Sequence, residues 1–149
     1  MKLSYYDSTM IQATRNDFKR AFQKVLSHPG FTDGKHATYM IHFYRVECGL
    51  KTLLCDQRRA SASSATDGLM WTHNLAEMVR ELRIPAQAIG KNITTFRLQR
   101  ERGSLPHWPT HCIMHAHTVW RYGVEMHAGD ENDLVQWLNR LVTYIETQL

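Results

Sequence analysis

The stretch that decides the fold is GDENDLVQWLNRLVTYI, residues 129–145. Its apolar side chains recur at spacings of four, three and four, the period of an amphipathic helix: Leu134, Leu138, Leu141 and Ile145. Gly129 and Asp130 supply a stop and an N-cap, and acidic residues fill the first turn, where the helix dipole favours them. We therefore predict a final helix with one apolar face, capped by Asp130.

The same period marks further helices earlier in the chain. We expect them at 11–25 behind a Thr9/Gln12 capping box, from an Asp33 cap to about 59, at 74–82, from Pro85 through Phe96, and at 110–120. Residues 60–69 are rich in Ser, Ala and Thr, which predicts a flexible loop. With no strand alternation or internal repeat, the pattern indicates a single all-α domain over 1–149. We predict an up-and-down helical bundle of about five helices.

Composition narrows the class of protein. The chain has 149 residues, 43% of them hydrophobic and 21% charged, which is the globular range. No apolar run approaches the roughly 18 residues that span a bilayer, and the first residues lack the apolar core of a signal peptide. Three cysteines with no CxxC spacing are typical of reduced thiols. We expect a cytoplasmic protein without a membrane partner.

Charge is distributed unevenly along the chain. Residues 1–120 hold 16 Lys/Arg and nine Asp/Glu, whereas residues 121–149 hold two and five, and the net charge is +4. A mildly basic surface on the first part of the chain fits RNA or a nucleotide as a partner, although a solvated helical surface has the same composition.

Nine histidines are many for this length, and four lie between residues 107 and 117. On a helix, His111 and His115 would lie one turn apart, a spacing that can hold zinc. A third protein ligand is not evident, and an exposed polar helix face explains the same pattern. We therefore expect no metal and no cofactor, and the alternative is a metal site at His111 and His115.

A second group of residues suits RNA cleavage. Cleavage by the RNA's own 2′-hydroxyl needs a proton acceptor that titrates near neutral pH and a fixed positive charge beside the phosphate. Arg121 and His127, with five residues between them, supply these groups, and His117 lies one helical turn from Arg121. His42, Arg45, Glu47 and Lys51 could line the same cleft. Glu47 and Lys51 also have the spacing of a surface ion pair on a helix.

Three stretches together resemble the HEPN superfamily (higher eukaryotes and prokaryotes nucleotide-binding). They are HFYRVECGLKTLL at 42–54, THNLAEM at 72–78, and Trp120-Arg121-Tyr122 followed by an acidic capped helix. The resemblance spans residues 10 to 148 and implies an all-α bundle, commonly a homodimer with its active cleft at the two-fold interface.

The resemblance also implies a function. Many members are metal-independent ribonucleases of toxin–antitoxin and antiphage systems, with an Arg, four to six residues, then His. Arg121 would hold the scissile phosphate and His127 would be the general acid or base. Tyr122 directly after Arg121, and Ala128-Gly129 after His127, depart from the common toxin pattern. Relatives without the histidine bind nucleotides or partner nucleotidyltransferases, so a non-catalytic binding module is the alternative.

Partners follow from the same resemblance. We expect a homodimer, with RNA or a nucleotide as ligand and a cognate antitoxin or nucleotidyltransferase as a possible protein partner. Apolar surface on exposed aromatic residues would support dimerisation, and the candidates are Tyr39, Tyr44, Trp71 and Trp108.

Overall fold

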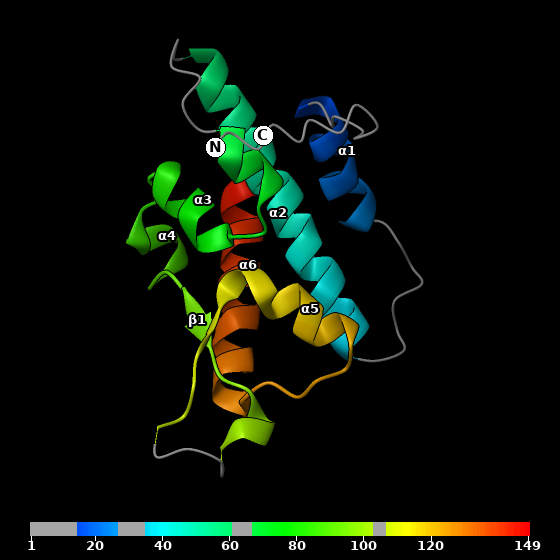
Figure 1. Cartoon of the computed structure of the whole chain (residues 1–149). Helices are drawn as coiled ribbons and strands as arrows, with labels where there is room; N and C mark the ends of the chain where they lie inside the picture. The colour runs from blue at the N-terminus through cyan, green and yellow to red at the C-terminus, as the bar shows by residue number, and fades with distance from the viewer. Residues whose placement is uncertain (1–14, 27–34, 61–66, 103–106) are drawn as a thin grey trace, which may run out of the picture.

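The computed structural model describes residues 15–26, 35–60, 67–102 and 107–149. It is mostly helical, as predicted, with one two-stranded antiparallel sheet (Figure 1). The helices are α1 (Arg15–Leu26), α2 (Lys35–Ala60), α3 (Leu75–Glu81), α4 (Ala86–Ile89), α5 (Ala116–Arg121) and α6 (Ala128–Gln148). Short 3-10 helices are η1 (Asp67–Trp71), η2 (Gln99–Glu101) and η3 (Ile113–His115), and the strands are β1 (Thr95–Phe96) and β2 (His111–Cys112).

The long helix α2 is the centre of the bundle. It packs against α1, α3, α5 and α6, and α4 rests on α6 (Figure 1). Gly49 permits the closest approach, because a β-carbon there would lie 2.8 Å from the Ile145 side chain and 3.1 Å from that of Phe22. Three helices therefore meet at one glycine, and the apolar residues predicted for α6 are buried in this core.

Helix boundaries agree with the prediction in two places. The long helix ends at Ala60, close to the expected stop. Asn74 caps α3, because its side chain accepts a hydrogen bond from the backbone N–H of Glu77. The predicted Thr9/Gln12 capping box and the Asp33 cap lie outside the described residues. Within the predicted loop 60–69, residues from Asp67 onward form η1.

Two predicted helices form over only part of their expected length. The helix expected from Pro85 to Phe96 ends at Ile89, because Gly90 adopts a φ of 74° that leaves the helical region. Phe96 instead lies in β1, where it pairs with His111 of β2. The helix expected over 110–120 therefore begins as a strand, passes through η3, and becomes α-helical only at Ala116. Tertiary pairing of two short segments outweighs a local helical period here.

The start of α6 differs from the prediction, and the difference affects the candidate site. The N-cap is His127, three residues before the predicted Asp130, and its Nδ1 accepts a hydrogen bond from the backbone N–H of Asp130 at 3.1 Å. Asp130 lies inside the first turn. Its carboxylate receives two bonds from the Arg97 guanidinium, at 2.9 and 2.8 Å, and one from the Arg97 backbone N–H.

Candidate functional site

The predicted surface ion pair of α2 lies inside the protein. Glu47 and Lys51 are both buried, and Lys51 Nζ donates to Glu47 Oε1 at 2.5 Å. The surface interpretation is therefore wrong. A buried charge is strongly unfavourable without its partner, so the two side chains hold each other in place. The second carboxylate oxygen of Glu47 remains for another donor.

That donor is His73, which lies in the turn between η1 and α3. Its Nδ1 is 2.8 Å from Glu47 Oε2. Because an ionised carboxylate can only accept, Nδ1 must carry the proton, which leaves Nε2 as the acid–base position. The side chain of His73 is 42% exposed, whereas that of Glu47 is 8% exposed. A buried acid thus orients an imidazole that solvent can reach.

His117 of α5 lies against His73, with ring centroids 4.3 Å apart. Its ring also packs on Phe43 and Tyr44 at 5.4 and 5.5 Å. Burial lowers the pKa of His117, and the neighbouring His73 lowers it further. At neutral pH His117 is therefore uncharged, and it presents a neutral ring to His73.

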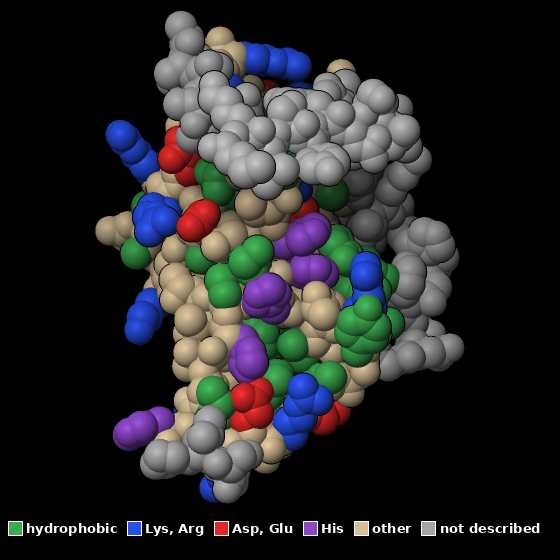
Figure 2. Space-filling model, viewed as in Figure 1, with side chains coloured by type: hydrophobic (Ala, Val, Ile, Leu, Met, Phe, Trp, Pro, Cys, Tyr) green, Lys and Arg blue, Asp and Glu red, His purple; other side chains and the backbone are tan. Residues whose placement is uncertain are grey.

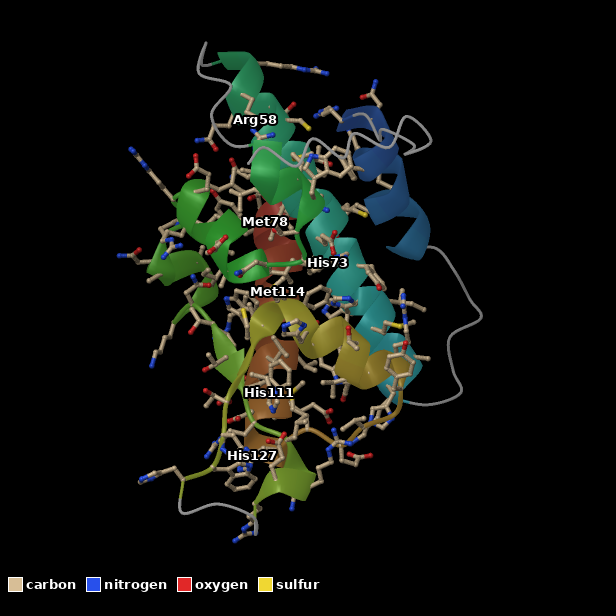
Figure 3. The ribbon with its side chains drawn as sticks, viewed as in Figure 1. Arg58, His73, Met78, His111, Met114 and His127 are labelled. Atoms are coloured by element: carbon tan, nitrogen blue, oxygen red, sulfur yellow. The ribbon has the colours of Figure 1, made fainter. Side chains whose placement is uncertain are left out.

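Arg121 completes this group from the end of α5. Its guanidinium donates to the Tyr44 hydroxyl at 3.1 Å and is otherwise exposed. Tyr122, the next residue, is 71% exposed. We call the group the His73 cluster, and its members are Tyr44, Glu47, Lys51, His73, His117 and Arg121. Figure 2 shows histidines gathered on the face where Figure 3 labels His73 and His111.

His127 lies elsewhere. Figure 3 places it toward the far end of this face from His73, with His111 between them. His127 contacts Trp108 edge-on at 4.8 Å between ring centroids, and Arg97 lies 3.4 Å from its Nδ1. We call Arg97, Trp108, His127 and Asp130 the His127 cluster. Within the described residues no hydrogen bond or ring contact joins this cluster to Arg121. The predicted pair of Arg121 and His127 is therefore not in contact within a single chain.

Two other predicted cleft residues point toward α6. Arg45 binds Glu146 at 3.0 Å, and its guanidinium lies 4.9 Å from the centre of the Phe22 ring. Burial lowers the pKa of His42, while a hydrogen bond with Asn139 of α6 opposes this shift. The structure therefore separates His42 and Arg45 from Glu47 and Lys51 of the same helix.

The alternative zinc pair does not form on one helix. His111 lies in β2, where its Nε2 is 2.6 Å from Glu101 and its ring stacks on Phe96. His115 is an exposed residue of η3. The one-turn spacing predicted for them is wrong because the chain is not helical between the two residues. In the described ranges, no group of three or more His, Cys, Asp or Glu residues is arranged to hold a metal ion.

His73 is the functional candidate that sequence reasoning missed. It lies within the 72–78 stretch that carries the resemblance, but its position suggested only a helix start. Its partner Glu47 is 26 residues away on another helix. Residue spacing carries no signal for such a pair, and only the packing of α3 against α2 creates it.

Comparisons with known proteins add no relative. The chain matches no protein-family model, no curated protein and no solved structure. In the parts of the chain that the structure describes, no helix has both the length and the apolar character needed to span a membrane.

Proposed function

We propose that this protein is a metal-independent endoribonuclease of the HEPN-like type, with its acid–base centre at His73 rather than His127. The observation that carries the proposal is the Glu47–His73 hydrogen bond of 2.8 Å beside His117 and the exposed Arg121. A carboxylate-oriented imidazole and a fixed cation are the two groups that cleavage by a 2′-hydroxyl needs.

In the proposed reaction, His73 both accepts and returns the transferred proton. Nε2 of His73 accepts the proton of the 2′-hydroxyl while the 2′-oxygen attacks phosphorus. The P–O5′ bond breaks, a 2′,3′-cyclic phosphate forms, and the leaving 5′-oxygen takes the proton back from the imidazolium. Glu47 stabilises that imidazolium, and Arg121 neutralises the charge that develops on the phosphate oxygens.

His117 is a positioning residue in this scheme. Because its pKa is lowered, it presents an uncharged ring to His73 and does not compete for the transferred proton. Lys51 is not a phosphate ligand in this scheme, because it is buried against Glu47. It donates to Oε1 of Glu47, and the other carboxylate oxygen, Oε2, is directed to His73.

We further propose that the protein acts as a homodimer in toxin–antitoxin or antiphage biology. Of the aromatic residues predicted to be exposed, Trp71 is 52% exposed, while Tyr39, Tyr44 and Trp108 are half-buried. Trp71 and Tyr122 adjoin His73 and Arg121 in sequence, so they offer apolar surface beside the cluster. A monomer in light scattering at micromolar concentration would contradict this part alone.

The test is RNA cleavage in the presence of EDTA. Wild-type protein should cleave, and His73→Ala and Arg121→Ala should each lower the rate by about 10²-fold or more, as expected for loss of an acid–base or charge-stabilising group. His115→Ala is the matched control, since it removes an exposed histidine outside the cluster. Cleavage by His73→Ala at the wild-type rate would overturn the assignment.

The second candidate is a non-catalytic module that binds a nucleotide in the same place. One observation favours it: His127 serves as a helix cap, so the Arg121–His127 motif does not form an acid–base pair within the chain. The EDTA assay separates the two functions. Binding of RNA by wild type without cleavage, weakened in Arg121→Ala but not in His115→Ala, would support the binding module.

A further inference from the structure

A cavity of about 330 Å³ lies at α3 and α4, in a different part of the chain from the His73 cluster. Val79, Ile84 and Ile89 form its apolar floor, and all three belong to the hydrophobic core. Arg80, Arg83 and Lys91 are exposed lining residues. Figure 2 shows Lys and Arg side chains projecting along the edge that Figure 1 assigns to α3 and α4.

The charge of this cavity is mostly uncompensated. Among the ion pairs of the described residues, one involves its lining, between Arg80 and Glu77 at 3.8 Å with both side chains largely exposed. A fourth cation lies beside the wall, because a β-carbon on Gly90 would sit 2.8 Å from a guanidinium nitrogen of Arg140. The cavity is therefore suited to an anion.

Arg83 has a strained backbone. Its φ is 53°, in the left-handed region that non-glycine residues rarely adopt. The strain persists because the turn is held on both sides, by Arg83 N–H to the Arg80 carbonyl at 3.1 Å and Ile84 N–H to the Val79 carbonyl at 3.2 Å. Strained residues of this kind concentrate at ligand sites, where the surrounding structure fixes an unusual side-chain position.

A second hollow of about 200 Å³ adjoins the first and shares Lys91 and Asn92 with it. Its other polar lining residues include three whose side chains can accept hydrogen bonds from a ligand, Thr94, Thr95 and Asp133, whereas Asp130 is already bound by Arg97. Asn92 donates from Nδ2 to the Ala76 carbonyl, while its buried Oδ1 has no hydrogen-bond partner among the described residues. Because that oxygen is enclosed, the acceptors open to a ligand are Thr94, Thr95 and Asp133, which suit the hydroxyl groups of a sugar.

We propose that these two hollows bind a phosphorylated ribose compound. Arg80, Arg83 and Lys91 would hold its phosphate, and the apolar floor would cover the carbon skeleton. Thr94, Thr95 and Asp133 of the second hollow would accept from its ribose hydroxyls. This chemistry can come from a free nucleotide or from the end of an RNA strand. The site does not depend on the proposed ribonuclease activity.

Isothermal titration of the full chain identifies the ligand. ADP and ribose 5-phosphate should bind, whereas adenosine should bind far more weakly because it lacks the phosphate. Binding of a 5′-phosphorylated ribonucleotide pentamer, but not of its 5′-hydroxyl counterpart or of ADP, would assign the site to a strand end. Adenosine binding as tightly as ADP, or inorganic triphosphate competing as well as ADP, would overturn the proposal.

Two variants locate the binding. Arg83→Gly removes a phosphate ligand at a position where glycine relieves the backbone strain, so the fold is retained, and ADP affinity should fall by about tenfold, the equivalent of one charge-assisted hydrogen bond. Arg100→Ala removes an exposed arginine on η2 and should leave affinity unchanged. Equal losses in both variants would show unspecific attraction to a basic protein and would refute the site. Because His73→Ala should bind ADP normally, this outcome is independent of the cleavage assay.

Discussion

The His73 and His127 clusters contain similar residues and differ in how fully these are engaged. In the His127 cluster, Nδ1 of the histidine caps α6, and Arg97 is held by Asp130. In the His73 cluster, the acid is on the buried side, and no hydrogen bond within the described residues engages Nε2 of His73. A histidine beside an arginine is therefore a site only where its reactive nitrogen and the cation remain available to a ligand.

Burial of the acid explains much of the difference. Asp130 lies near the surface at a helix start, where it receives bonds from Arg97 and serves the architecture. Glu47 is buried with Lys51, so its charge cannot be screened by water. Its remaining oxygen is directed to His73, which extends to the surface. Substitution of the acids, substitution of the histidines and a change of pH each test this comparison.

The largest effect is expected from Glu47→Ala. It leaves Lys51 buried without a counter-charge, which should lower the free energy of unfolding by about 3–5 kcal/mol. Urea denaturation measures this loss, and Asp130→Ala, which removes a more exposed acid, should cost less. The double variant Glu47→Leu/Lys51→Leu should recover much of the stability, since no unpaired charge remains. A double variant as unstable as Glu47→Ala would show that the pair is not the cause.

A smaller effect is expected at His127. His127→Ala removes the cap of α6 and should lower stability by about 1 kcal/mol, whereas His127→Asn retains a capping side chain and should cost less. Thermal unfolding and the EDTA cleavage assay are to be measured on the same samples. Both variants should still cleave RNA. Loss of cleavage in a stable His127→Asn protein would return His127 to the catalytic role that the sequence suggested.

The smallest expected effect is a change of stability with pH, and the two clusters should show it in different pH ranges. The hydrogen bond from Arg97 lowers the pKa of Asp130 in the folded state, so its stabilisation is present above the unfolded value of about 3.9 and is lost as pH falls below it. We expect a few tenths to 1 kcal/mol, since the pair is partly exposed. Burial lowers the pKa of His117 in the folded state, so its contribution to stability is lost as the pH falls below the unfolded value of about 6.5.

Stability curves from urea denaturation at successive pH values check these windows. Asp130→Asn should flatten the slope below about pH 4, and His117→Gln should reduce it just below about pH 6.5. His42 has a pKa lowered by burial and contributes in the same window, so part of that slope should persist. A His117→Gln curve that coincides with wild type would mean that His117 is not kept uncharged by its surroundings.

The sequence alone determined the helical class, the long α2, the short α3 and the apolar face of α6, because helical periodicity is a local property. It singled out Glu47, His117 and Arg121, which lie together in the structure, but it paired Arg121 with His127. Tertiary structure decided the rest. It buried the Glu47–Lys51 pair, brought in His73 from 26 residues away, and made His127 a helix cap. These outcomes depend on which helices pack together and which side chains lose contact with water, and residue spacing encodes neither.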